Sequence, residues 1–222
     1  MKQLAAALRK ELLLQWRTRA HFVATLAFGW AALFLFSFAG SAPDPTELRG
    51  HAAGFLWLGL LLASTLSLSE GFHREMEQSA LEGQLLLPAS PTALYYGKAL
   101  ANFLELTLLG VGLLPVMVGL YDAGTGRGWA LVGVVALGAA GLAAPGTLYA
   151  AMASQARAGQ VLLPLLLYPL VIPALVASVN ATSLLILGDP MHLARSWLVL
   201  LASFDALYWL ACGLVFDRVV EE

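Results

Sequence analysis

Long stretches of this sequence lack charged side chains. Four intervals of 24, 20, 29 and 31 residues between charged residues contain no formal charge, and two more, of 23 and 21 residues, contain one acid each. A helix needs about 20 apolar residues to cross the roughly 30 Å hydrocarbon core of a bilayer, so each interval is long enough. The spacing predicts an all-α integral membrane protein with six transmembrane helices. The predicted spans are residues 21–39, 52–69, 99–121, 129–153, 160–180 and 196–216.

The composition supports a lipid environment and excludes other classes. Hydrophobic residues make up 59% of the chain and charged residues 12%, about half the charged share of a soluble domain. A net charge of −2 gives no basic surface for nucleic acid, so we expect no nucleic-acid partner. The single cysteine, Cys212, excludes an intrachain disulfide and argues against a cysteine metal site.

The distribution of basic residues predicts the topology. Six spans put both termini on one side of the membrane, and with that side cytoplasmic, nine of the twelve Lys and Arg residues face the cytoplasm. The first span has an alternative interpretation as a signal peptide, because its start is basic and small residues lie near 39–42. Its apolar stretch is longer than a typical signal sequence, so we expect it to be a retained span.

The first 18 residues have the pattern of an interfacial helix. Leu4, Leu8, Leu12 and Trp16 recur every four residues, and basic residues occupy the other faces. This pattern predicts an amphipathic helix on the inner leaflet. The alternative is a helical extension of the first span.

Three prolines distinguish the fifth span. Pro164, Pro169 and Pro173 lie within ten residues, and each removes a backbone donor. We therefore predict a kinked helix whose far end, residues 180–186, folds back as a short outer segment.

The longest polar connection, between spans two and three, predicts a cytoplasmic helix over residues 75–88. Ser79 is suited to cap the helix and Glu82 completes a capping box, while Pro88 ends it. An acidic start and an apolar stripe are typical of a helix that docks in a groove of a partner, although a surface-lying connector has the same pattern. The predicted docking residues are Glu77, Ser79, Leu81, Glu82, Leu85, Leu86 and Pro88.

This connection also carries a family resemblance. The sequence SALEGQLLLP at 79–88, followed by GKAL at 97–100, resembles the coupling-helix signature of type 2 ABC exporter membrane subunits. The chain is similar nearly end to end to the cytochrome c maturation protein B family, also called heme exporter protein B. Its opening at 9–14, LASTLSL at 62–68 and LLLYPLVIP at 165–173 resemble the corresponding family segments.

The resemblance implies a subunit without catalytic activity in the bacterial cytoplasmic membrane. The implied partners are a cytoplasmic ABC ATPase that holds ATP and Mg²⁺, a second copy of the chain, other cytochrome c maturation proteins and a heme chaperone. The chain has no phosphate-binding loop of its own. The implied function couples the ATPase to heme export or to release of the heme-loaded chaperone. The alternatives are a type 2 exporter of a drug, lipid or polysaccharide, or a non-transporting scaffold.

Polar residues inside the predicted spans, and histidines near their ends, are the remaining candidates for functional residues. Glu105 and Asp205 should face protein or water, because an acid in hydrocarbon costs at least about 2.5 kcal/mol. Each either lines a transport path or makes a packing contact, for example between Glu105 and Asn102. His51 and His192, near the outer interface, are possible heme contacts, since a neutral imidazole ligates heme iron. We expect no metal site and no cofactor bound by this chain alone.

Overall fold

The computed structural model describes seven segments of the chain, and all of them are helical. The described residues are 2–17, 19–39, 45–77, 91–123, 128–154, 159–189 and 191–221. The helices are α1 (Lys2–Arg17), α2 (Arg19–Ala39), α3 (Pro45–Glu77), α5 (Pro91–Tyr121), α6 (Gly128–Ser154), α7 (Gly159–Leu187) and α8 (Ala194–Glu221). The described segments contain no strand, which confirms the predicted all-α class.

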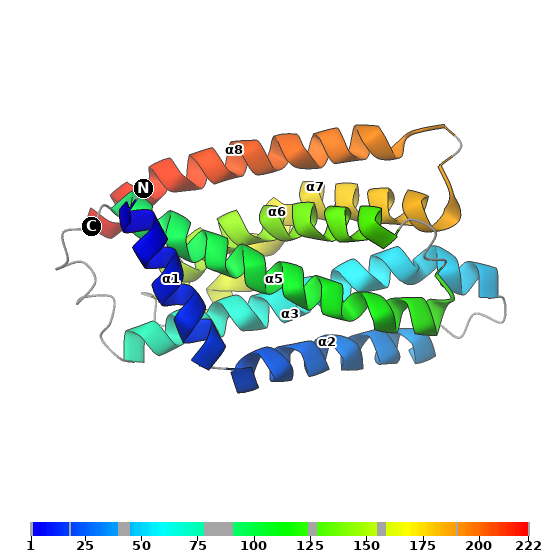
Figure 1. Cartoon of the computed structure of the whole chain (residues 1–222), viewed down its shortest axis with the longest axis horizontal. Helices are drawn as coiled ribbons and strands as arrows, with labels where there is room; N and C mark the ends of the chain where they lie inside the picture. The colour runs from blue at the N-terminus through cyan, green and yellow to red at the C-terminus, as the bar shows by residue number, and fades with distance from the viewer. Residues whose placement is uncertain are drawn as a thin grey trace.

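Six of these helices are long and apolar enough to cross a membrane, as predicted. Their apolar segments are 19–39, 47–69, 91–121, 128–153, 161–187 and 194–216. The six helices lie side by side along the length of the molecule, with α2 and α8 at opposite edges of the bundle (Figure 1). Both termini, the end of α3 and the start of α5 lie at the same end (Figure 1). α3 therefore ends, and α5 begins, at the end of the bundle that holds the termini.

The centre of the bundle is built on α6, which packs against α3, α5, α7 and α8. Small residues on α6 make this close packing possible. At Gly138, the indole ring of Trp57 and the hydroxyl of Ser178 occupy the space that a side chain would fill. Helices that approach through small residues gain van der Waals contact, which is the main attraction between helices in lipid.

The predicted fold-back at residues 180–186 is wrong. α7 is one helix through Leu187, with all three prolines inside it. Pro173 is the last of them, so no later residue of α7 lacks a backbone donor. Asn180 instead donates from its side-chain amide to the carbonyl of Val176 at 2.7 Å, a bond within the same helix.

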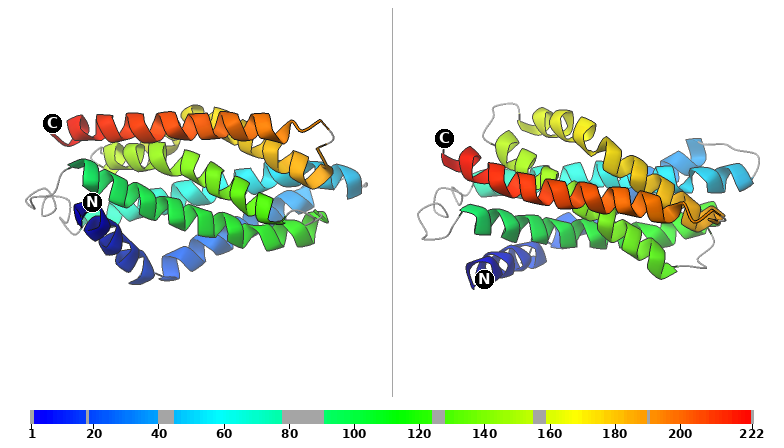
Figure 2. Two further views of the ribbon diagram at one scale, coloured as in Figure 1. Left: turned by 45° about the horizontal axis from the view of Figure 1, so that its top comes forward. Right: turned by 90° about the horizontal axis from the view of Figure 1, so that it is seen from above.

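α1 is a separate helix that is inclined to the six long ones (Figure 2). It packs mainly along the first turns of α5 and only slightly on α2. α1 is therefore not a straight extension of the first span. The sequence predicted a helix here, and its position relative to a lipid surface stays a prediction.

Candidate functional site

The predicted docking helix lies largely outside the described residues. Ser79, Leu81, Glu82, Leu85, Leu86 and Pro88 all fall in the 78–90 gap. Glu77 is the last residue of α3, but its side chain is outside the description. The roles predicted for these residues stay predictions. The described site therefore consists of the helices that flank the connection, together with α1.

A close approach between α1 and α5 forms the first part of this site. A Cβ placed on Gly97 would lie 2.7 Å from the Cβ of Ala7 and 3.2 Å from the backbone nitrogen of Leu8. Glycine is required here because α1 occupies the space of a side chain. This contact fixes the distance between the two helices just after the connection.

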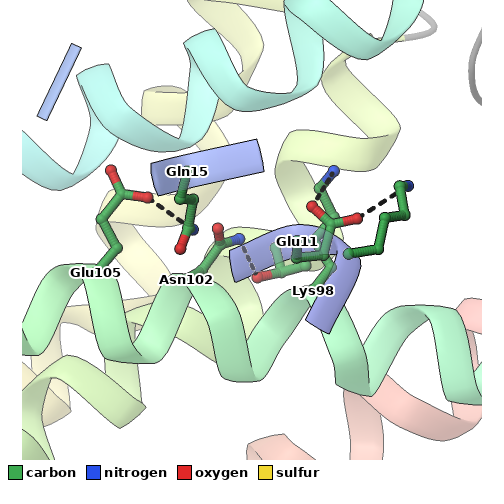
Figure 3. A network of polar contacts seen from close by, with 7 residues as sticks. Glu11, Gln15, Lys98, Asn102 and Glu105 are labelled. Carbon is green, nitrogen blue, oxygen red and sulfur yellow. Dashed lines mark hydrogen bonds and ion pairs between the residues drawn. The ribbon is translucent and has the colours of Figure 1, made fainter. Parts of the chain in front are cut away.

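Glu11 forms the second part, one turn further along α1. Its carboxylate lies 3.2 Å from the ammonium nitrogen of Lys10 and 4.0 Å from that of Lys98 on α5. The side chains of Glu11 and Lys98 are both only 13% exposed. The pair is therefore partly shielded from solvent, and it sets the rotation of α1 about its axis (Figure 3).

Glu105 joins three helices. Its carboxylate accepts a hydrogen bond from the Gln15 amide of α1 at 2.8 Å (Figure 3). It accepts a second one from the Ser67 hydroxyl of α3 at 2.5 Å. Glu105 lies seven residues after Lys98, about 10 Å along α5. Two neutral donors satisfy an acid inside the apolar segment, as polar groups in a membrane require.

Asn102 does not contact Glu105 in the way the sequence suggested. It donates to the Thr147 hydroxyl of α6 at 2.9 Å, and Thr147 donates to the Ala143 carbonyl at 2.6 Å. The two residues are one turn apart on α5 but turn toward different neighbours. Asn102 thus ties α5 to α6, whereas Glu105 ties α5 to α1 and α3.

Asp205, the second intramembrane acid, lies on α8 against α6. Its Oδ1 atom is buried and has no hydrogen-bond partner among the described residues. A side chain at Gly141 would meet this oxygen at 2.9 Å, so the carboxyl group rests on the α6 backbone. Among the described residues, Asp205 forms no ion pair. Whether it lines a transport path or only packs against α6 stays a prediction.

The two candidate heme contacts lie at the end of the bundle opposite the termini. His51 is exposed near the start of α3, with its ring centroid 5.8 Å from that of Phe55. His192 is exposed in the turn before α8 and has a positive φ of 55°. Among the described residues, no group of three or more His, Cys, Asp or Glu side chains is arranged to hold a metal ion.

Sequence reasoning missed Glu11, Gln15 and Ser67. A usable signal was present, because Glu11 and Gln15 are four residues apart and share one face of an otherwise apolar and basic helix. Polar residues on one face of a membrane-associated helix indicate a contact with protein. Ser67 gave no such signal, since serine is common in membrane spans.

Comparisons with a family model and with individual proteins point to the same family. The family model described as CcmB protein matches residues 2–215. Heme exporter protein B of Haemophilus influenzae is 34% identical over 172 residues, which cover 76% of each chain. Heme exporter protein B of Escherichia coli K12 is 30% identical over 96 residues, which cover 43% of each chain. The match over residues 2–215 includes α1, the first five long helices and α8 as far as residue 215.

Proposed function

Because the chain belongs to the CcmB protein family, we propose that it is the membrane subunit of an ATP-driven heme exporter in the bacterial inner membrane. The observation that carries the proposal is the family match over residues 2–215, on a chain with six helices able to span a bilayer. The similar proteins of Haemophilus influenzae and Escherichia coli K12 are named heme exporter protein B. The exporter acts in cytochrome c maturation, by heme export or by release of a heme-loaded chaperone.

In this proposal the energy comes from a separate cytoplasmic ATPase. Both termini are cytoplasmic, so the connection between α3 and α5 faces the ATPase. Residues 75–88 dock in a groove of that protein, with Leu81, Leu85 and Leu86 providing apolar contacts. Two copies of the chain pair to form the membrane part, and each docks one ATPase subunit. The chain itself is not catalytic.

Movement of the docking helix reaches the membrane through the two helices that flank it. Ser67 of α3 and Glu105 of α5 are joined by a hydrogen bond of 2.5 Å, which supports joint movement of these helices. Their other ends lie at the outer face, where His51 and His192 are the proposed heme contacts.

The test is co-purification of the tagged chain with its partners in mild detergent, followed by mass spectrometry. We expect wild-type chain to retain an ABC ATPase and heme-handling maturation proteins. Glu82→Lys and Leu85→Asp should lose the ATPase while the chain still inserts in the membrane. Glu47→Lys is the matched control, because it reverses an exposed charge at the other end of α3 and should retain the ATPase.

Each alternative gives a different result. An ATPase without heme proteins would support an exporter of another substrate, and heme proteins without an ATPase would support a scaffold. If Glu82→Lys and Leu85→Asp both retain the ATPase as well as Glu47→Lys does, the docking assignment is wrong.

A further inference from the structure

The orientation of α1 is fixed by contacts with α5 along one of its faces. Ala7, Glu11 and Gln15 follow one another at intervals of four residues, and they meet Gly97, Lys98 and Glu105 in the same order along α5. Because helical residues are about 100° apart, these three residues lie within one narrow sector. The opposite sector of α1 therefore turns away from the bundle.

That outward sector combines cations with apolar side chains. Leu13 is two residues from Glu11, about 200° around the helix, and it is 54% exposed. Arg9 and Arg17 lie four residues before and after Leu13, and both are exposed. Trp16 lies beside them and is 66% exposed.

Arg19, at the start of α2, extends this surface. Its guanidinium carbon lies 4.2 Å from the centroid of the Trp16 ring, and its Nε donates to the Trp16 carbonyl at 3.2 Å. The cation–π contact keeps a positive charge next to an exposed aromatic ring. The level of the lipid headgroups suits such a pair, because the indole ring finds apolar contact there and the guanidinium group finds water or phosphate.

The charges on this surface are all of one sign. The only acid in residues 1–21 is Glu11, which is turned inward to Lys98. Among the described residues, none forms an ion pair with Arg9, Arg17 or Arg19. An anion from outside the described chain is therefore the complementary partner.

We propose that Arg9, Leu13, Trp16, Arg17 and Arg19 form a binding surface for anionic phospholipid. The guanidinium groups bind lipid phosphates, because their planar donors match phosphate geometry. Leu13 and Trp16 enter the boundary between headgroups and acyl chains. A phospholipid supplies both chemistries within one molecule, whereas an acidic protein surface would leave Leu13 and Trp16 in water. The proposal does not depend on heme export.

The experiment uses the full chain in nanodiscs of phosphatidylcholine, with or without 30% phosphatidylglycerol as the anionic probe. A Leu13→Cys spin label in a Cys212→Ser background reports depth through its accessibility to oxygen and to a water-soluble nickel complex. Native mass spectrometry counts the phosphatidylglycerol molecules that remain bound. We expect phosphatidylglycerol to draw the label toward the acyl boundary and to be enriched on the chain.

Charge removal provides the matched comparison. Arg17→Gln should lower the preference for phosphatidylglycerol about five-fold, because each basic residue at an anionic surface contributes about that factor. The triple variant of Arg9, Arg17 and Arg19 to Gln should abolish it. Arg195→Gln removes an exposed arginine at the other end of the bundle and should leave the preference unchanged. A carbodiimide cross-link between Glu11 and Lys98 verifies that α1 is still docked in every variant.

Two results would overturn the proposal. The first is equal label depth in the two nanodiscs. The second is an equal effect of Arg17→Gln and Arg195→Gln on retained phosphatidylglycerol while the Glu11–Lys98 cross-link persists. Either result would show that this surface does not select anionic phospholipid.

Discussion

Replacement of Gly97 by alanine tests how α1 is held. The added methyl group would lie 2.7 Å from the Cβ of Ala7, whereas ordinary van der Waals contact begins at 3.4 Å. The difference, 3.4 minus 2.7, requires α1 to retreat by 0.7 Å. Neither neighbour is the end of a flexible side chain, because one is a Cβ atom and the other is the backbone nitrogen of Leu8. The whole helix has to move.

We expect this movement to weaken the contacts further along α1. Glu11 and Lys98 are already 4.0 Å apart, so a retreat of this size takes them beyond ion-pair distance. Overpacking of this kind costs typically about 1–3 kcal/mol. The assay is the yield of the zero-length carbodiimide cross-link between Glu11 and Lys98, read by mass spectrometry, together with the melting temperature in detergent. Gly97→Ala should lower both.

Gly119→Ala is the control on the same helix. No heavy atom lies within 4 Å of the position its Cβ would take, so the substitution adds only helix propensity. It should keep the wild-type cross-link yield and raise stability by up to about 1 kcal/mol. If Gly97→Ala matches Gly119→Ala in both measurements, the close approach of α1 and α5 does not hold α1 in place.

Two further pairs of substitutions distinguish contacts that stabilise the folded chain from contacts that do not. Glu105→Ala removes the acceptor of Gln15 and Ser67 and should cost about 1.2 kcal/mol, at about 0.6 kcal/mol for each hydrogen bond between membrane helices. Glu105→Gln keeps an acceptor oxygen and should retain most of the melting temperature, so lost heme transport in that variant would assign a role to the charge. Thr182→Val leaves the buried indole donor of Trp57, now 2.9 Å from the Thr182 hydroxyl, without a partner, at a cost of about 1–3 kcal/mol. Ser178→Ala removes a buried hydroxyl that has no hydrogen-bond partner among the described residues, and it should leave the melting temperature unchanged. Equal shifts of the melting temperature in Thr182→Val and Ser178→Ala would contradict this reasoning.

The six spans could be predicted from the sequence because the physics that sets them is local. A formal charge inside hydrocarbon is costly wherever the helix packs, so charge-free intervals mark the spans without knowledge of the fold. The two exceptions, Glu105 and Asp205, were predicted to face protein, and the structure places both against neighbouring helices. The local cost of charge in hydrocarbon was therefore sufficient to predict the spans and the burial of these two acids.

The partners of these acids depend on helix rotation, which the sequence does not determine. Glu105 and Asn102 are one turn apart, so a contact between them was a reasonable expectation. The rotation of α5 instead turns Asn102 to Thr147 and Glu105 to Ser67 and Gln15. That rotation follows from where α6 and α1 pack, and this packing follows from small residues such as Gly97.

The error in α7 has a different cause. The three prolines were taken to kink the helix, and the segment after them was predicted to fold back, as it can in water, where freed backbone groups bind solvent. In a membrane bundle, neighbouring helices and local adjustments satisfy the freed groups, so Pro164, Pro169 and Pro173 remain inside one helix. The cost of ending a helix within hydrocarbon exceeds the cost of a proline inside it.

The hydrogen bond between Ser67 and Glu105 has a consequence for the proposed coupling. Ser67 lies ten residues before the end of α3, and Glu105 lies fourteen residues after the start of α5, about 15 Å and 21 Å along the two helices. A force applied at the connection therefore acts on two helices that are joined within the membrane. Gln15 joins α1 to the same carboxylate, so a displacement of α3 and α5 changes the position of α1 as well. If α1 is anchored to lipid by its arginines, the bilayer resists this displacement, and the composition of the leaflet becomes one of the terms that set the energy of coupling.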